Sequence, residues 1–304
     1  MANPISTLAS MRNSQQLNKP HRTDEIENFV VVPLRRPGRW LSAALMLFVL
    51  LTIADLLITN PRWQWPTVME YLVSTPILVG VGNTLLLTVL AELVGISLGI
   101  VLAILRLSEN PLLSWSSAGF TWIFRGIPPM VMILFIYFLS ALVPMISIGI
   151  PFGPSLKIIA TNKVVTQLVA AVIGLGLAQA AYVAEIVRSG ILSVSAGQSR
   201  AALALGMTPM RAMRHIVFPQ AMRVVVPPLS NEVISMVKAT SLVSIIGFTE
   251  LLTTVQIIYG RTFEQIPLLM VAVIWYGVIT TILTLVQSNI ERRLNKSVKI
   301  AKKG

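Results

Sequence analysis

The chain has 304 residues, of which 55% are apolar and only 12% are charged, and its formal net charge is +12. Soluble domains carry about twice that fraction of charged residues, so the bilayer must be the solvent for most of the chain. Because the chain has no cysteine, disulfides, thiolate metal sites and a cysteine nucleophile are excluded.

Six apolar segments follow one another along the chain, and each is long enough to cross a hydrocarbon core about 30 Å thick as a helix. Helix is the expected state because lipid offers no partners for backbone N–H and C=O groups. The predicted fold class is an all-α integral membrane protein with about six transmembrane helices. The expected spans are Trp40–Thr59, Ile77–Leu105, Pro128–Ile146, Val165–Val187, Val224–Ile246 and Pro267–Ile290.

Lysines and arginines are unevenly divided between the two sides of these segments. Nineteen of the 24 lie on the side of the two termini, four lie on the other side, and Lys238 lies inside a segment. Cytoplasmic loops of membrane proteins carry such an excess. We therefore expect both termini in the cytoplasm.

Segment 188–223 is a polar, basic stretch between long apolar segments, and it carries two sets of helix-start signals. Ser195, with a glutamine three residues later, is typical of a capping box, and Gly206 suits a left-handed helix C-terminus. Thr208 followed by proline repeats the start signal. We predict a helix, a turn at Gly206 and a second helix that ends at Pro219.

Small side chains make up most of the first of these helices. Ala201, Ala202 and Leu205 are expected near one face, where small residues let another surface approach the backbone closely. Two interpretations are open at this point. The helix either docks on a partner protein, or lies on the bilayer or on its own bundle.

Several stretches, in order along the chain, resemble one family of membrane proteins. They are GVGNTLLLTVL at 80–90, FRGIPPMVMILFIYF at 124–138, AQAAYVAEIVRSGI at 178–191, GQSRAALALGM at 197–207 and IVFPQAMRVVVPPLSNEVISMVKATSL at 216–242. Together they resemble permease subunits of bacterial ATP-binding-cassette importers, in the branch for polar amino acids such as histidine, glutamine, glutamate, arginine and opines. The resemblance covers roughly Gly80 to Arg292.

This resemblance implies a type I importer permease fold with a cytoplasmic coupling helix, located in the bacterial inner membrane. The implied core of five spans covers 77–290 and includes the coupling loop 188–223. An extra span at 40–59 precedes it. The cytoplasmic tail at 1–39 has a composition typical of disorder, and a basic cytoplasmic tail covers 291–304.

In that family the coupling helix docks in a cleft of a separate ATPase subunit. The positions expected to do so here are Gly197, Gln198, Arg200, Ala201, Ala202, Leu205 and Gly206. The family usually has glutamate where this chain has Arg200. The polar contact at that point must therefore differ.

The resemblance also implies the partners of the chain. These are two copies of the ATPase, which hold ATP and magnesium, a second permease chain that is a copy or a paralogue, an amino-acid-binding protein outside the membrane, and membrane lipids. No cofactor, metal or nucleic acid is expected on this chain itself. The implied cycle is alternating access, in which closure of the ATPases moves the coupling helices.

Polar residues inside the spans are the other candidates for function, because a charge at mid-bilayer is costly. Glu92 lies on one helical face with Gly95 and Gly99, which form a small-xxx-small stripe. That face is expected to pack against another helix, with Glu92 either satisfied there or lining the transport path. Glu185 and Arg188, three residues apart, are expected to pair at a helix end.

The segment that contains Lys238 is the most polar of the six. Asn231, Ser235 and Lys238 follow one another at helical spacing and make one polar stripe. This stripe is expected either to line the pathway or to form hydrogen bonds at a subunit interface.

The sequence contains no GxxxxGK[ST] phosphate loop, no His/Asp/Glu cluster with metal-ligand spacing and no nucleophile–base arrangement. We therefore expect no enzymatic activity of its own. One rival function is an ion-coupled secondary transporter, which predicts repeated halves that this sequence does not display. The other is a membrane-tethered DNA binder, because 197–218 superficially resembles a helix-turn-helix, but its first helix lacks side chains suited to base edges.

Overall fold

The computed structural model describes residues 37–150, 153 and 155–301. The chain divides into two compact units, Met1–Asn60 and Pro61–Gly304. The first contains helix α2 (Pro37–Thr59), which is apolar and exposed over most of its surface. It coincides with the first predicted span, whereas most of the predicted tail at 1–39 lies outside the described residues.

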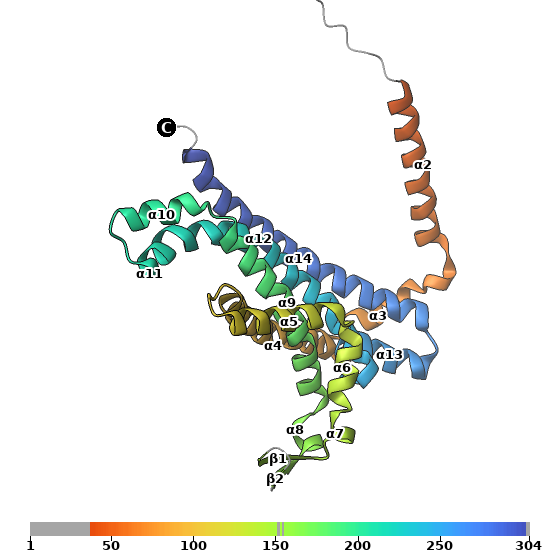
Figure 1. The fold of residues 1–304 in the computed structure, drawn as a ribbon. Helices are drawn as coiled ribbons and strands as arrows, with labels where there is room; N and C mark the ends of the chain where they lie inside the picture. Colours follow the sequence, from red (N-terminus) through yellow and green to blue (C-terminus); the bar gives the residue numbers. More distant parts are fainter. Residues whose placement is uncertain (1–36, 151–152, 154, 302–304) are drawn as a thin grey trace, which may run out of the picture. The chain divides into compact units, whose positions relative to one another are not determined.

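The second unit is helical apart from one hairpin (Figure 1). Its elements, in chain order, are η1 (Pro61–Trp63), α3 (Trp65–Leu72), α4 (Thr75–Arg106), α5 (Pro111–Gly126), α6 (Pro129–Tyr137), α7 (Leu139–Leu142), β1 (Met145–Gly149), β2 (Ser155–Ala160), α8 (Thr161–Val164), α9 (Gln167–Leu192), α10 (Ala196–Ala204), α11 (Pro209–Ala212), η2 (Met213–Val217), α12 (Phe218–Ala239), η3 (Thr240–Ile246), α13 (Leu251–Thr262) and α14 (Gln265–Ala301).

Five helical runs in the described part of the chain are long and apolar enough to cross a membrane. They are α2, α4, α9, the continuous run Pro209–Ile246 and α14. A sixth span is present if α5 and α6, which meet at an angle of 101°, are counted as one broken span. The all-α membrane fold with about six spans is thereby confirmed.

The predicted span Pro128–Ile146 is wrong in its C-terminal half. α6 ends at Tyr137 after nine residues, and the chain enters strand β1 at Met145 after the short helix α7. The segment from 127 to 156 contains no charged residue, so its hydropathy does not reveal where helix gives way to strand. Its isoleucines favour strand once proline and glycine have interrupted the helix.

The stretch between the second and third predicted spans, expected as a loop, contains helix α5. Asn110 caps this helix, since its side-chain oxygen accepts a hydrogen bond from the Leu112 amide at 2.9 Å. At the other end Ile127 adopts an extended conformation before Pro128, and this is where α5 and α6 bend away from each other.

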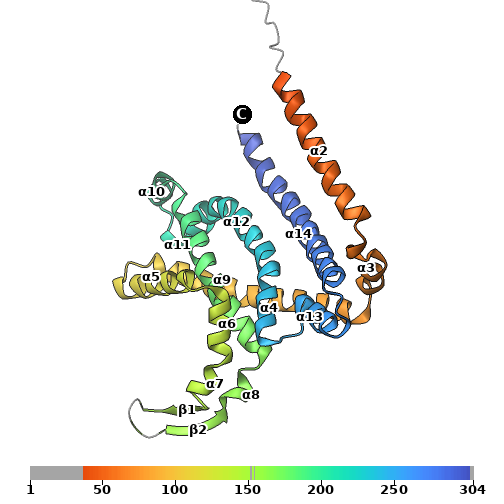
Figure 2. The ribbon, with the colours of Figure 1, turned by 90° about the vertical axis from the view of Figure 1, so that its right-hand side faces the viewer.

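The hairpin β1–β2 lies at the end of the second unit opposite α10 and α11 (Figures 1 and 2). Ile146 pairs with Ile159, and Ile148 pairs with Leu156 beyond a bulge. These two pairs share one face of the hairpin because side chains alternate along a strand. The result is an apolar ladder on a two-stranded sheet.

The most extensive helix–helix contact in the second unit joins α4 to α9. A Cβ atom placed on Gly95 would lie 2.6 Å from the Cβ of Gln179, and one on Gly99 would lie 2.9 Å from the Ala180 carbonyl oxygen. The backbones therefore approach so closely that a side chain does not fit. The predicted packing of the Gly95–Gly99 face against another helix is confirmed.

Two apolar clusters complete the core, and α4 contributes residues to both. One brings α3, α13 and α14 together around Val68, Leu251 and Leu268. The other joins α6, α9 and η3 around Ile133 and Val243. α12 contributes to both clusters, so its position depends on all the other spans of this unit.

Replacing Gly99 by alanine should lower the free energy of unfolding by about 1–3 kcal/mol, because the new methyl group meets the Val183 side chain and the Ala180 carbonyl. Gly82→Ala on the same helix is the matched control, since nothing lies within 4 Å of its Cβ position. The control should be neutral or slightly stabilising. Unfolding of the purified variants in detergent measures the difference, and equal values would contradict the close crossing.

Candidate functional site

The helix predicted to start at Ser195, in segment 188–223, is capped as predicted. The Ser195 hydroxyl accepts a hydrogen bond from the Gly197 amide at 3.3 Å at the start of α10. Gly206 has φ +81°, and the Met207 amide donates to the Ala202 carbonyl at 3.1 Å. This is a Schellman ending, which requires a residue at positive φ and so suits glycine. The predicted turn at Gly206 is confirmed.

The second half of this segment differs from the prediction. The Thr208 hydroxyl caps α11 by accepting from the Arg211 amide at 3.4 Å, but the helix does not end at Pro219. It passes through a π-turn, η2, in which the Phe218 amide donates to the Met213 carbonyl, and continues as α12. Proline has no N–H to donate to the hydrogen-bond pattern of an α-helix. A π-turn, whose hydrogen bonds span five residues instead of four, lets the helix continue past Pro219.

The tip of this helix–turn–helix, residues 195–218, exposes large apolar side chains. Leu205 is 84% exposed and Met210 is 75% exposed, and three arginines of the same segment are exposed as well. These exposed arginines are Arg200, Arg211 and Arg214. An apolar patch with a polar rim is typical of a protein–protein docking surface.

The structure divides the seven predicted docking residues into two groups. Ala202 is buried and turns toward the chain itself, so it does not share the exposed face expected for it with Ala201 and Leu205. The other six are exposed on α10 and its C-terminal turn. These six are Gly197, Gln198, Arg200, Ala201, Leu205 and Gly206.

The predicted polar stripe of α12 lies on one face of that helix. Asn231 and Lys238 are exposed and Ser235 is half-buried, whereas Met236 and Val237 are buried against the core. The polar face therefore points out of the chain. It is available to a water-filled path or to another subunit.

Glu92 lies in the α4–α9 contact and is almost fully buried. The Gln179 side-chain amide donates to its Oε1 atom at 3.0 Å, and its Oε2 atom has no hydrogen-bond partner among the described residues. The structure places Glu92 in a helix–helix contact, which was one of the two expectations. Glu185 pairs with Arg188 as predicted, through hydrogen bonds of 2.9 and 2.5 Å.

Sequence reasoning missed Glu250, which is fully buried at the start of α13. Its Oε1 accepts from the Thr253 amide at 2.8 Å, and its Oε2 accepts from the Tyr276 hydroxyl at 2.7 Å and the Thr84 hydroxyl at 3.3 Å. One carboxylate thus joins α4, α13 and α14. A local signal was available in the sequence. Glu250 follows Gly247 and is itself followed three residues later by Thr253, a pattern typical of a helix start.

The comparisons with known proteins assign the family. Residues 95–296 match the model for the binding-protein-dependent transport system inner membrane component. The chain is 41% identical over 271 residues to the arginine transport system permease protein ArgU of Corynebacterium glutamicum, covering 87% of this chain and 82% of ArgU. It is 34% identical over 233 residues to the glutamate/aspartate import permease protein GltK of Escherichia coli O6:H1, covering 76% and 98%.

A solved structure agrees with this assignment. The crystal structure of an amino acid ABC transporter with histidines matches with a TM-score of 0.60 and 33% identity, covering 72% of this chain and 94% of that one. The chain therefore belongs to the family of binding-protein-dependent transport system inner membrane components. It has the fold of a type I importer permease, and it is a multi-pass inner-membrane protein.

Tyr276→Phe should lower the free energy of unfolding by about 1.5–3 kcal/mol, because it removes a hydrogen bond to a buried carboxylate. Tyr259→Phe is the control, since Tyr259 packs on the same apolar cluster from α13. It should change stability by less than about 0.5 kcal/mol. Denaturation of both variants in detergent separates the two cases, and an unchanged Tyr276 variant would argue against the anchoring role of Glu250.

Proposed function

We propose that this chain is the permease subunit of an importer that carries polar amino acids across the inner membrane, driven by separate ATPase subunits. The family assignment supports the permease role. The substrate class is supported by relatives named for arginine and for glutamate/aspartate transport. Because those substrates differ in charge, the relatives support the amino-acid class rather than one side chain.

The observation that carries this proposal is the exposed helix–turn–helix and its connection to a span. Its tip presents Leu205 and Met210, and the run Pro209–Ile246 is helical throughout. A displacement applied at the tip therefore passes along hydrogen-bonded backbone to the polar stripe of α12. We propose that the ATPase docks on the six exposed positions among the seven predicted ones, with the seventh, Ala202, supporting them from beneath.

The orientation proposed for the chain has both termini and the helix–turn–helix in the cytoplasm. The supporting observation is the excess of nineteen lysines and arginines over four on the other side. The hairpin β1–β2 and α13 then face outward, where an amino-acid-binding protein would deliver substrate.

The proposed complex contains two permease chains, identical or paralogous, and two ATPase subunits that hold ATP and magnesium. The outward polar face of α12 supports a second permease chain, because Asn231 and Lys238 need polar surroundings inside a membrane. In this complex Asn231, Ser235 and Lys238 line the pathway or the subunit interface. On the neighbouring helices, Glu92 accepts a hydrogen bond from Gln179 and Glu185 accepts hydrogen bonds from Arg188.

Gly206→Val should abolish stable association with the ATPase and reduce uptake at least tenfold, because a β-branched residue does not tolerate φ +81°. Gly206→Asn is the matched control, since asparagine adopts the left-handed conformation more readily. It should keep most of the association. Co-purification and vesicle uptake measure both effects, and unchanged values for the valine variant would contradict coupling through this turn.

Lys238→Met should lower the uptake rate or alter the preference among arginine, glutamate and glutamine in vesicles, while leaving ATPase association intact. Lys163→Met, in α8 on the proposed outer side, is the control and should change neither. A Lys238 variant with normal rate and preference would refute a role for the stripe in the pathway.

Energy dependence tests the proposal as a whole. Uptake by vesicles that contain the complex should stop when ATP is removed and should continue when the proton gradient is collapsed. The reverse pattern would favour the ion-coupled secondary transporter.

A further inference from the structure

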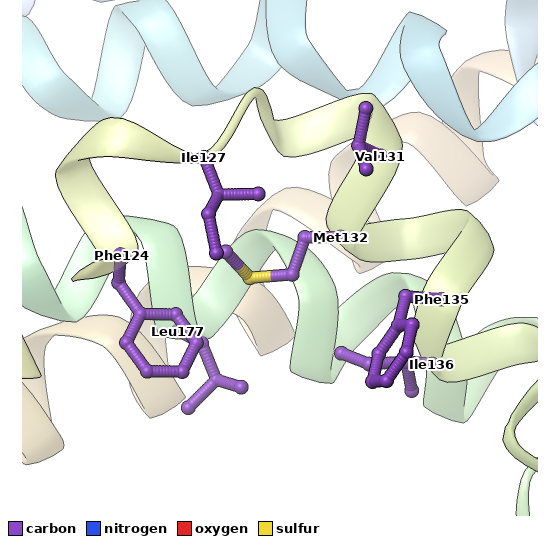
Figure 3. A pocket seen from close by; sticks show the side chains of 7 residues that line it. All are labelled: Phe124, Ile127, Val131, Met132, Phe135, Ile136 and Leu177. Atoms are coloured by element: carbon purple, nitrogen blue, oxygen red, sulfur yellow. The ribbon is translucent and has the colours of Figure 1, made fainter.

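Two hollows are lined in part by residues at the end of α5, next to its bend with α6. The first is an apolar cavity of about 440 Å³, and Figure 3 shows its side chains gathered around it. Its wall is made by Phe124 and Ile127 at the end of α5, Val131, Met132 and Phe135 of α6, and Leu177 of α9. The side chains of this wall are hydrocarbon, with one thioether, so the cavity suits an aliphatic chain.

The second hollow, about 500 Å³, has a charged and aromatic wall. Arg106 ends α4, Arg125 lies in the last turn of α5, and Tyr182 and Glu185 belong to α9. The Arg106 Nη1 atom donates to the Ser114 carbonyl at 3.0 Å. The guanidinium carbon of Arg125 lies 5.4 Å from the centre of the Tyr182 ring.

The charges around the second hollow leave it positive. Glu185 is the acid in its wall, and Arg188 binds that carboxylate through two hydrogen bonds. Arg106 and Arg125 interact electrostatically with Glu185, but neither forms a salt bridge among the residues that the structure describes, and the three arginines around this single carboxylate leave a net positive charge. Each guanidinium carries five N–H donors in a planar fork that matches phosphate oxygens.

The two hollows share two of the helices that line them, α5 and α9. Phe124 of the apolar wall and Arg125 of the basic wall are consecutive in α5. Leu177 and Tyr182 are five residues apart in α9, which is about 7.5 Å along the helix axis. Trp122, in the basic wall, is largely exposed, as tryptophans are at the boundary between membrane and water.

We propose that these two hollows form a binding site for one phospholipid with an anionic headgroup. The phosphate lies against Arg106 and Arg125, and one acyl chain enters the apolar cavity at the α5–α6 bend. The lipid comes from the cytoplasmic leaflet, a detail that rests on the orientation proposed above. With its acyl chain between α5 and α6, it occupies the angle between the two helices and supports their bent arrangement.

Other occupants fit the two hollows less well. A free anion fills only the basic half and leaves the apolar cavity empty. A zwitterionic amino acid pairs its carboxylate with the arginines but has no hydrocarbon chain for the apolar cavity. Of these occupants, a phospholipid supplies both an anionic group and a hydrocarbon chain in one molecule.

Native mass spectrometry of the purified full-length chain tests the site, after equilibration with an equimolar mixture of phosphatidylglycerol and phosphatidylcholine. The unmodified chain should retain phosphatidylglycerol in preference. Each of Arg106→Gln and Arg125→Gln should reduce that preference about fivefold, the equivalent of about 1 kcal/mol. Arg261→Gln, an exposed arginine of α13, is the charge-matched control and should leave the preference unchanged.

A second pair of variants tests the acyl-chain cavity. Val131→Trp fills the cavity and should displace the bound lipid, whereas Val101→Trp adds the same bulk on α4 at a position that is equally exposed. Val131 and Val101 are both 50% exposed, so a general effect of tryptophan would appear in both. Retention of the lipid by Val131→Trp, or equal losses in the two variants, would overturn the proposal.

Inorganic phosphate separates a lipid site from a simple anion site. Millimolar phosphate should not displace phosphatidylglycerol from the unmodified chain. Displacement would overturn the lipid assignment and leave an anion site. Lipid retention is measured without ATPase, binding protein or substrate, so its failure would leave the proposed transport function untouched, and the failure of transport would leave the lipid site untouched.

Discussion

The close crossing of α4 and α9 is the contact on which the second unit depends. In a bilayer the hydrophobic effect does not drive helices together, because lipid tails are as apolar as the side chains that would replace them. Close backbone contact through glycines supplies dispersion energy instead. The same kind of close contact recurs along α9, where Gly174 packs against Ile133 of α6 and Gly190 packs against Val225 of α12. α9 is therefore the helix around which three others assemble.

The polar groups inside the unit follow from this packing. Glu92 and Glu250 are both buried, and each is bound by side chains from another helix. These hydrogen bonds offset part of the cost of removing a carboxylate from water. The side chains of Lys238 and Asn231 have no such hydrogen-bond partner among the residues that the structure describes, because their face of α12 points away from the core. The chain gives each of these buried acids at least one hydrogen-bond partner and leaves the polar face of α12 exposed.

Periodic and compositional signals predicted most of this arrangement. The spans, the capped turn at Gly206 and the packed glycine face of α4 could be read from the sequence because each depends on neighbours within a few residues. The broken third span could not, since the stretch 127–156 is uncharged throughout but forms helices α6 and α7, strand β1 and the start of strand β2. Glu250 escaped notice for a related reason, because its partners are more than twenty residues away in Thr84 and Tyr276. Contacts of that range appear only once the helices have packed.

The π-turn at Met213–Val217 fixes the angular register between the helix–turn–helix and the span that follows it. Each residue of an α-helix turns the side-chain direction by about 100°. One residue more or fewer in η2 would therefore rotate Leu205 and Met210 by roughly that angle relative to α12. The exposed side chains of η2, those of Met213, Arg214 and His215, can be replaced without changing this register, whereas Val217 is buried and the length of the segment is fixed. Deleting one residue of η2 would therefore be more damaging than several substitutions at its exposed positions.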